Sequence, residues 1–424
     1  MSSRVMVRSF VNRDSPRSRI GQVRDKIGFA IWRLATHIGS AGGSASRFPA
    51  HAVCCHSPQE LTCTPMRHID IHPDRVRIVG GNWDLTTATL ESTRTFRGLQ
   101  ERFVLGRGWE DTTWYHRWSE SVEREPTCGI DRWLVSIGRD DLRRKCFEVE
   151  QFFREARERW AHADLSYRHR IMLGVGRHGD IFVLDGAPWL ICLQLAGVDR
   201  FPMRIAVRHP DWQTLRSEIQ QYVDDFCSGR GGTYQPLVHP DLGDFHSARS
   251  DKRLQMIQAT LPVPRGRLLD IGANWGYFCI KLERLGFDCH AVESKVAAQY
   301  FLKRLRRASG CHFRVYEASV FDCHVVSAMK FDVVLALNVF HHFIKDSLQH
   351  RKLVDLLSHL RMDAMYFQAH VPTEGQMVNA YRNYEPDEFV RFILANSCLS
   401  KACVLGEDVG SEGVSRPVFL LTRE

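Results

Sequence analysis

The chain has 424 residues, of which 44% are hydrophobic and 25% charged, and it carries a formal net charge of +8. This is the composition of an ordinary globular protein with a sizeable core, and it excludes a single small domain, wholesale disorder and a fibrous repeat. No stretch reaches about eighteen uncharged apolar residues, and the first thirty or so lack the apolar core of a signal peptide. We therefore expect an intracellular, cytoplasmic protein without a transmembrane segment.

The positive charge is concentrated at the start of the chain. Residues 1–60 hold nine Lys and Arg against three Asp and Glu, net +6, which leaves 48 against 46, or +2, for the rest. We predict that residues 1–65 form a basic arm with one amphipathic helix over about 22–38, whose apolar face comprises Ile27, Ile31, Leu34 and Ile38. Such an arm suits nucleic acid or an anionic membrane, although a solvated tail is the commoner explanation.

The 13 cysteines indicate reduced thiols, because several lie in apolar runs that are typical of strands. Adjacent cysteines and histidines raise the possibility of a metal site. None has the spacing of a known zinc site, so we predict no metal centre; the pairs are Cys54–His56, Cys289–His290, Cys311–His312 and Cys323–His324.

The middle of the chain predicts a small α+β domain over about residues 70–240. Its first part, 77–118, is rich in aromatic residues, and we expect the tryptophans there to fill a small core. The periodicity then predicts a helix from Asp141 to Trp160, and further elements in the order strand, strand, helix, strand, helix at 170–174, 180–185, 190–196, 201–207 and 215–227.

Residues 164–212 resemble the ParB/sulfiredoxin-like module of bacterial proteins, through the sequences GVGRHGDIFVLDG and FPMRIAVRHPDW. In that family a charged Arg-His-Arg cluster follows the Asp-Gly step, whereas Ala187, Pro188 and Trp189 follow it here. The difference removes the groups that would bind an anionic ligand. We therefore expect a scaffold or specificity domain that has lost nucleotide or DNA binding.

Four polar residues, His239, Asp241, Asp244 and His246, lie just before the next region. They could hold a metal ion or a polar substrate. A solvated loop that caps the following helix accounts for them equally well, and we favour that interpretation.

From Arg265 onward apolar strands alternate with amphipathic helices, which is typical of a parallel α/β sheet. We predict a Rossmann-like doubly wound domain over about 245–424. We expect one helix of this domain to begin near Tyr277 and another to cover 348–360. Its strands are expected at 267–271, 287–292, a third ending near 315, 331–338 and 364–369, with an antiparallel pair at 401–404 and 418–421 to close the sheet.

A glycine-rich turn joins the first of these strands to its helix. Gly272 and Gly276 flank Asn274, and glycines allow backbone to approach a ligand closely while the helix N-terminus offers N–H groups to a carboxylate. Glu293 closes the second strand about twenty residues later, where one carboxylate can accept hydrogen bonds from both hydroxyls of a ribose. The pattern predicts a site for a nucleoside-containing ligand.

Two ligand classes compete for such a site, dinucleotides and S-adenosylmethionine. The dinucleotide fingerprint G-x-G-x-x-G fails, because Asn274 and Tyr277 occupy the positions of its second and third glycines. Asp270, just before the turn, would repel a pyrophosphate but suits the ammonium and sulfonium groups of S-adenosylmethionine. The residues therefore favour the methyl donor.

The sequence DIGANWGYF at Asp270–Phe278 resembles the first motif, D-I-G-x-x-x-G, of class I S-adenosylmethionine-dependent methyltransferases, and the resemblance covers about 249–423. It implies S-adenosyl-L-methionine as the cofactor. It also implies contacts to the methionine end, the ribose, the adenine and the transferred methyl from Asp270, Gly272, Asn274, Gly276, Glu293, Glu317, Ala318 and Asn338.

Histidines mark the side of the site where a methyl acceptor would lie. His341, His342 and His370 follow strands at their carboxyl ends, where ligands of open α/β sheets bind. Histidine can accept a proton near neutral pH, so we predict catalytic roles for His341 and His342. A structural hydrogen-bonding role is the alternative for each of the three.

Two motifs that the sequence lacks restrict the chemical class of the methyl acceptor. Asn338 leads into Val-Phe-His-His, so the [DNS]-P-P-[YFW] motif of amino-methylating nucleic-acid enzymes is missing, as is the Pro-Cys step of 5-methylcytosine chemistry. By resemblance, we expect a small-molecule or glycan-type acceptor. The alternatives are a nucleic-acid-binding protein whose methyltransferase domain acts on nucleic acid or senses S-adenosylmethionine, and a Rossmann-like fold that has lost its ligand.

Overall fold

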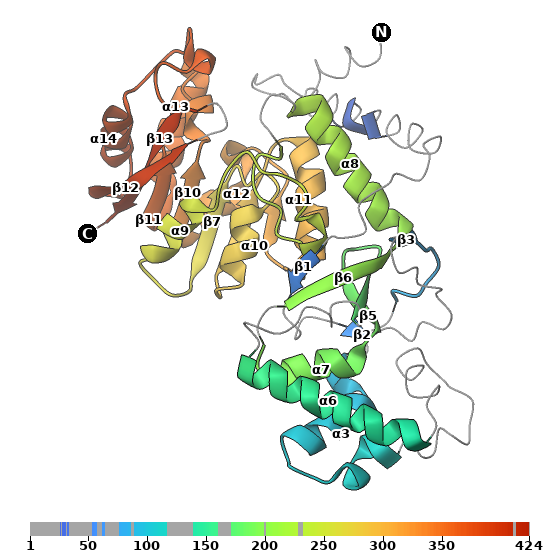
Figure 1. Ribbon diagram of the computed structural model, residues 1–424. Helices are drawn as coiled ribbons and strands as arrows, with labels where there is room; N and C mark the ends of the chain where they lie inside the picture. Colours follow the sequence, from blue (N-terminus) through green and yellow to red (C-terminus); the bar gives the residue numbers. More distant parts are fainter. Residues whose placement is uncertain are drawn as a thin grey trace. The chain divides into compact units, whose positions relative to one another are not determined.

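The computed structural model describes residues 26, 28–30, 32–33, 53–56, 62–63, 76–85, 89–116, 139–159, 171–198, 201–227, 232–409 and 413–423. They belong to two compact units (Figure 1). The larger unit comprises Met1–Gly42, Glu218–Val238 and Phe245–Glu424, and the smaller comprises Gly43–Ser217 and His239–Asp244. The α/β class, with a Rossmann-like sheet and a smaller preceding region, is confirmed.

The larger unit is built on a seven-stranded sheet in the order β12-β13-β11-β10-β7-β8-β9. The strands from β7 to β11 pair in parallel, and β13 is antiparallel to both β11 and β12. β8 and β9 extend the sheet on one side of β7, whereas β10 and β11 extend it on the other. The strand order therefore changes direction between β7 and β10, which is the position where open α/β sheets bind ligands. The strands are β7 (Arg267–Ile271), β8 (Asp288–Val292), β9 (Arg314–Tyr316), β10 (Lys330–Leu337), β11 (Arg361–Gln368), β12 (Lys401–Val409) and β13 (Ser415–Thr422).

Helices connect these strands and cover the sheet (Figure 1). The sequence predicted α10 and α13, whereas α9, α11, α12 and α14 were missed. Asp346 caps α13 through the N–H groups of Leu348 and Gln349, and Glu385 and Glu388 form a capping box on α14. The helices are α9 (Lys252–Ala259), α10 (Tyr277–Glu283), α11 (Val296–Ala308), α12 (His324–Ala328), α13 (Ser347–His359) and α14 (Pro386–Asn396).

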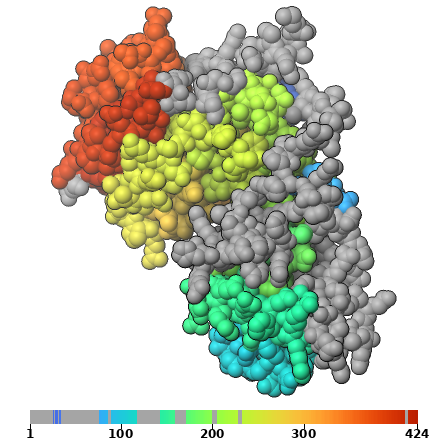
Figure 2. Space-filling model, in the orientation of Figure 1, coloured from blue at the N-terminus to red at the C-terminus, as the bar shows by residue number. Residues whose placement is uncertain are grey.

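The core of this unit lies against the two central strands β10 and β11. Their continuous apolar runs are buried because both faces of a parallel sheet are covered. On the face shown in Figure 2, the yellow segment that contains α9 and α10 adjoins the red segment that contains β12 and β13. α9 packs closely on β12, since a Cβ added to Gly406 would lie 2.9 Å from Met256 Cε.

Residues from two other parts of the chain complete the larger unit. Tyr222, near the end of α8 (Pro210–Phe226), stacks edge-on to Trp275 and Phe301 with ring centroids 5.6 and 5.4 Å away. The described residues between 26 and 33 are helical, as predicted, and Phe29 and Trp32 are buried. The side chains predicted to form the face of that helix, Ile27, Ile31, Leu34 and Ile38, lie outside the described residues.

The smaller unit contains a sheet in the order β1-β6-β4-β5-β2, with β3 paired to β6. The predicted hairpin, helix and strand over 170–207 are confirmed as β4 and β5, then α7 and β6. The elements are β1 (Val53–His56), β2 (Thr62–Cys63), β3 (Arg77–Ile78), β4 (Met172–Val175), β5 (Ile181–Asp185), β6 (Phe201–Arg208), α3 (Arg94–Phe103), α6 (Arg139–Arg159) and α7 (Ala187–Leu195).

Aromatic side chains do fill a small core in this unit. Trp114 is buried against α3, where a Cβ added to Gly98 would overlap the Trp114 Cβ, so this close packing requires glycine. Phe103 stacks on Phe153 of α6 with ring centroids 4.1 Å apart. The structural role predicted for the tryptophans is confirmed at Trp114.

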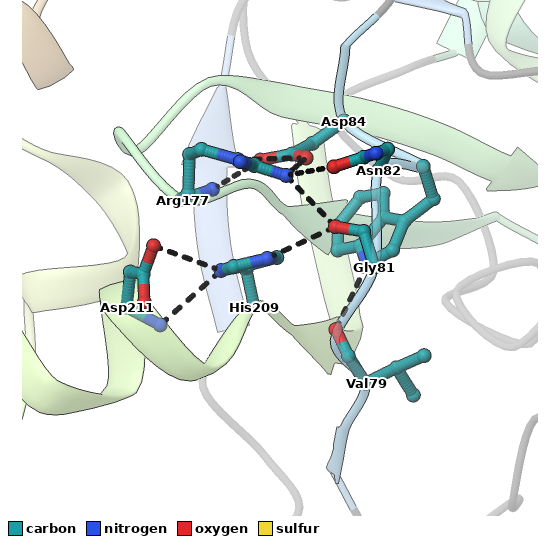
Figure 3. Close-up of polar contacts among 8 residues, drawn as sticks. Val79, Gly81, Asn82, Asp84, Arg177, His209 and Asp211 are labelled. Carbon is teal, nitrogen blue, oxygen red and sulfur yellow. Dashed lines mark hydrogen bonds and ion pairs between the residues drawn. The ribbon is translucent and has the colours of Figure 1, made fainter.

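A polar network anchors the segment around Asn82–Asp84 (Figure 3). The Arg177 guanidinium donates to both Asp84 carboxylate oxygens and to the carbonyl of Gly81. His209 donates from Nε2 to the same carbonyl at 3.2 Å, since its Nδ1 accepts the Asp211 N–H. Burial raises the pKa of Asp84, but Arg177 more than offsets this and holds it below the usual range. In the contacts drawn, these polar groups bind one another, which indicates that the network has a structural role.

The prediction of a solvated loop at His239–Asp244 is wrong for its first half. Asp241 is fully buried and accepts hydrogen bonds from Arg208 Nε and Nη2 at 2.8 and 2.7 Å and from Trp212 Nε1 at 2.7 Å. His239 is buried as well, and its Nε2 contacts the Gly179 carbonyl. An acidic residue in a loop looks solvated in a sequence, because its cationic partners lie about 30 positions away.

Candidate functional site

The glycine-rich turn after β7 has a left-handed backbone at three positions. Gly272, Asn274 and Gly276 have φ values of 73°, 54° and 84°, a region that L-residues with large side chains avoid. A Cβ at Gly272 would lie only 3.1 Å from Val339 Cγ2. The turn therefore needs glycine both for its conformation and for the space next to the chain that leaves β10.

Glu293 lies directly behind this turn. Its Oε2 accepts the N–H of Asn274 at 2.9 Å and its Oε1 accepts the N–H of Lys295 at 2.7 Å. The carboxyl group is buried, and burial raises its pKa despite these two bonds. The residue thus joins the end of β8 to the turn and keeps lone pairs on both oxygens.

Asp270 is buried near the end of β7. The Cys279 thiol lies 3.6 Å from its Oδ2 and is its single side-chain hydrogen-bond donor in the described part of the chain. Burial, with a smaller contribution from the charge of Glu293, raises the pKa of Asp270 to about 7. Because so few hydrogen bonds offset the cost of burying this carboxylate, a cationic ligand next to it would be favourable.

Asn338 directly follows β10 in the left-handed conformation, with φ 56°. Its Nδ2 donates to the Tyr234 hydroxyl at 3.0 Å, while its Oδ1 is buried without a hydrogen-bond partner among the described residues. An unsatisfied buried amide oxygen is costly, so it indicates a ligand that donates a hydrogen bond. Sequence analysis missed Tyr234, because it lies 104 positions before its partner.

Two buried arginines, Arg249 and Arg253, share one carboxylate next to Tyr234. Arg249 Nη1 and Arg253 Nε lie 2.6 and 3.3 Å from the same oxygen of Asp408. The Arg253 guanidinium also lies over the ring of Phe278, 5.3 Å from its centroid, in the first turn of α10. Burial raises the pKa of Tyr234, but the two arginines more than offset it and lower that pKa overall. Two guanidinium charges for one carboxylate leave this cluster with an excess positive charge.

Glu317 and Ala318 follow β9, next to the strand that carries Glu293. The Glu293 N–H donates to the carbonyl of Tyr316, so this end of β9 adjoins the turn. Glu317 is exposed and accepts a hydrogen bond from Lys303 Nζ at 2.8 Å, and Ala318 packs against the core. A direct hydrogen bond brings Asn274 and Glu293 together, with Gly272 and Gly276 on the same turn and Asp270 at the end of the strand that leads into it.

The three candidate histidines lie close together beyond β10 and β11. The ring centroid of His341 is 4.0 Å from that of His342 and 5.9 Å from that of His370. Both ring nitrogens of His341 are buried without a hydrogen-bond partner in the described ranges, whereas His370 Nε2 contacts Asn383 Oδ1 at 3.0 Å. Burial, followed by the neighbouring histidines, holds the pKa of His341 well below its usual value.

The surroundings of the histidines contain one saturated ion pair. Glu374 accepts two hydrogen bonds from Arg416 at 2.7 and 2.6 Å and one each from the Val371 N–H and Gln376. Burial opposes ionisation, but these donors lower the pKa of Glu374 to about 2. No three or more His, Cys, Asp or Glu side chains in the described part are arranged to hold a metal ion.

The sheet order, the left-handed turn and the acidic residue after β8 are consistent with a Rossmann-like methyltransferase fold. Residues 269–357 match the family model described as "Methyltransferase domain". This part of the chain is therefore similar to a methyltransferase domain. The match to a ParB-like module stays a prediction for residues 164–212. Over the described residues, every helix is too short or too polar to cross a bilayer.

Comparison with solved structures gives partial matches at low identity. The bifunctional kinase-methyltransferase WbdD is 21% identical over 48% of this chain and 46% of its own, with a TM-score of 0.39. Magnesium protoporphyrin IX methyltransferase (ChlM) from Synechocystis PCC 6803, with bound SAM, is 14% identical over 41% of this chain and 77% of its own, with a TM-score of 0.32. The N-methyltransferase NodS from Bradyrhizobium japonicum WM9 is 15% identical over 41% of this chain and 94% of its own, with a TM-score of 0.33. The match thus spans less than half of WbdD. No curated protein sequence matches this chain.

Proposed function

We propose that this protein transfers a methyl group from S-adenosyl-L-methionine to a small-molecule or glycan-type acceptor. The observation that carries the proposal is the turn at Gly272–Gly276, with left-handed φ values, supported from behind by the Glu293 carboxylate. A nucleoside site needs backbone that a ligand can approach and an acceptor for the ribose hydroxyls; the turn supplies the first and Glu293 the second.

The residues fit the methyl donor part by part. Glu293 accepts from the ribose hydroxyls, and Glu317 with Ala318 borders the adenine. Asp270, in its poorly compensated environment, faces the ammonium of the methionine moiety. Asn338 Oδ1, which lacks a partner among the described residues, accepts a hydrogen bond from the same end.

Arg253 adds a residue to this set. It is buried beside Phe278 at the start of α10, and it belongs to the cluster with excess positive charge. A buried charge of this kind is stabilised by an opposite charge. We assign it to the carboxylate of the methionine moiety, opposite Asp270 and its ammonium partner.

The bound cofactor supplies an electrophilic methyl group on a sulfonium. The task of the chain is therefore mainly to orient the acceptor in line with that methyl and to exclude water. His341 and His342, after β10, lie where the acceptor would enter, and we propose that they contact it. A cytoplasmic location, a scaffold role for the ParB-like region and the absence of a metal centre complete the proposal.

Titration calorimetry of the purified full chain tests the cofactor. S-adenosylmethionine and S-adenosylhomocysteine should bind with micromolar affinity, and NAD, as the control, should not. Binding of NAD alone, or of none of the three, would refute the proposal.

A second candidate function rests on the net charge of +6 over residues 1–60. In it, the basic arm binds nucleic acid and the methyltransferase domain acts on it or senses S-adenosylmethionine. Affinity for DNA or RNA that falls steeply with salt would support it. Absence of binding at low salt would exclude it.

A further inference from the structure

The histidine group beyond β10 and β11 has unused hydrogen-bonding capacity. Both ring nitrogens of His341 and the Nδ1 of His370 are buried and have no partner among the described residues. His341 is only 4% exposed and His370 only 1%. Buried polar atoms are nearly always satisfied in folded proteins. These nitrogens are therefore available to bind a ligand. They lie at the end of the sheet where the acceptor is expected.

We propose that the methyl acceptor binds here as an oxyanion, a carboxylate or a phosphate, held by His341 and His370 and neutralised by Lys345. The proposal rests on the proposed methyltransferase function and specifies the chemical class of its acceptor. In it His341 contacts the acceptor as a hydrogen-bond donor.

The charges around His341 support an anion. Four groups that lower its pKa electrostatically, His342, His370, Lys345 and Arg416, are neutral or positive. Lys345 is partly buried and forms no ion pair with any described side chain. Its backbone is held firmly, because its carbonyl accepts the Tyr381 N–H at 3.0 Å.

Glu374 and Glu385 are the carboxylates that act electrostatically on His370, and Glu374 is not available to balance these charges. Glu374 uses both oxygens for the Arg416 guanidinium and also accepts from Val371 and Gln376. An ion pair saturated in this way presents almost no net charge to its neighbours. The Lys345 ammonium is therefore left for an incoming anion.

The alternative role for His341, general base for a hydroxyl acceptor, suits its environment less well. An effective base has a pKa near the working pH, whereas burial and the neighbouring histidines hold the pKa of His341 well below 6.5. An oxyanion needs no base. It would instead raise the pKa of an adjacent imidazole and so favour the protonated, donating form.

The chemical step balances without a proton acceptor. A lone pair of the acceptor oxyanion forms the O–CH₃ bond while the CH₃–S bond breaks, and that electron pair stays on sulfur as a neutral thioether. One negative and one positive charge disappear together. Because separated charges are destabilised in a buried site, their loss in the transition state is favourable there.

The test uses the full chain saturated with S-adenosylhomocysteine. The probes are inorganic phosphate, acetate and the neutral methyl α-D-glucoside, titrated calorimetrically near pH 7 with ionic strength matched by chloride. We expect phosphate or acetate to bind, with proton uptake revealed by repeating the titration in buffers of different ionisation enthalpy. Which of the two binds distinguishes a phosphate from a carboxylate acceptor.

Variants locate the binding. Lys345→Met should weaken anion binding by about tenfold, as expected for a charged hydrogen bond, and His341→Asn should abolish the proton uptake. Lys330→Met is the matched control, since Lys330 lies at the opposite end of β10 and pairs with Asp363. All three should bind S-adenosylhomocysteine as the wild type does.

Binding of the glucoside without either anion, silence from all three probes, or an equal effect of Lys345→Met and Lys330→Met would overturn the oxyanion assignment while leaving the proposed function intact. Failure of S-adenosylhomocysteine to bind would instead refute the proposed function itself.

Discussion

Glu293 Oε2 accepts the backbone N–H of Asn274 at 2.9 Å, so the residue proposed to bind the ribose also fixes the glycine-rich turn. A carboxylate has about four lone-pair sites, and Asn274 and Lys295 occupy two of them. Burial raises the pKa of this carboxyl group, while the Ser294 N–H also lowers it by hydrogen bonding, and the lone pairs that the backbone donors leave are available to the ribose hydroxyls. The side chain can therefore hold the turn and the ligand simultaneously.

Replacing Glu293 should weaken binding of every ligand that contains the ribose. We expect Glu293→Ala to lose about tenfold or more in affinity for S-adenosylmethionine, because charged hydrogen bonds contribute about 1.5–3 kcal/mol. Calorimetry measures it. Glu283→Ala is a suitable control, since Glu283 also accepts backbone N–H bonds, from His312, but lies at the other end of α10. Wild-type affinity in Glu293→Ala would end the ribose assignment.

Affinity for S-adenosylmethionine should rise with pH through the titration of Asp270. Its pKa is raised to about 7, so the free site binds a proton that is released when an ammonium group binds. Calorimetric titrations between about pH 6 and 7.5, below the range in which an α-amino group titrates, should show an increasing association constant and proton release. The curve should be flat for Asp270→Asn. A wild-type affinity independent of pH would contradict the ammonium contact.

The same group affects the stability of the free protein in the opposite direction. Because the folded pKa of Asp270 lies above its value of 3.8 in an unfolded chain, its contribution to stability is complete below about pH 4 and is lost as pH rises through 7. Asp270→Asn should therefore raise the Tm at pH 8 relative to the wild type, as scanning fluorimetry can show. An equal or lower Tm would argue against the raised pKa.

Arg253 can be tested by shortening the ligand. If it binds the methionine carboxylate, Arg253→Gln should weaken S-adenosylmethionine and S-adenosylhomocysteine equally, by about tenfold. It should leave 5′-methylthioadenosine, which lacks the amino-acid group, unchanged. Glu293→Ala, in contrast, should weaken all three. A loss of 5′-methylthioadenosine binding in Arg253→Gln would indicate a general structural defect in place of the assigned contact.

The Glu374–Arg416 pair should control the acid stability of the larger unit. The pKa of Glu374 is about 2 in the folded chain against 4.5 in a model peptide, so its contribution is present above about pH 4.5 and is lost as pH falls towards 2. The difference corresponds to at most about 3 kcal/mol. Glu374→Gln should lower the Tm at pH 7 and reduce its acid dependence. Lys330→Gln, at an exposed pair, should change neither.

Periodicity and turn chemistry were sufficient to predict the sheet. The strand from Arg267 to Ile271, the turn at Gly272–Gly276 and the strand ending at Val292 were placed within a residue, because glycines and buried apolar runs are local signals. α11 was missed although Phe301, Leu302 and Leu305 have helical spacing. Its many charged residues resemble those of a solvated segment.

The polar partners could not be predicted in the same way. Tyr234 meets Asn338, and Arg249 meets Asp408, across more than 100 residues. Such contacts depend on which strands become neighbours, and the sequence alone does not state that. The histidines were found because they follow strand ends, yet the saturation of Glu374 by Arg416, which leaves Lys345 unbalanced, requires the folded chain.

The aromatic contacts of Tyr222 determine which truncations of the protein keep its core intact. A fragment starting at residue 245 would lose Tyr222 and Tyr234, and would uncover Trp275 and Phe301 beside the candidate turn. Deleting residues 1–60 would likewise strip Phe29, whose ring lies 5.5 Å from that of Tyr300. A truncation that silences the enzyme would thus report a damaged core, and the role of the basic arm is better examined by replacing arginines before residue 26 while keeping the chain length.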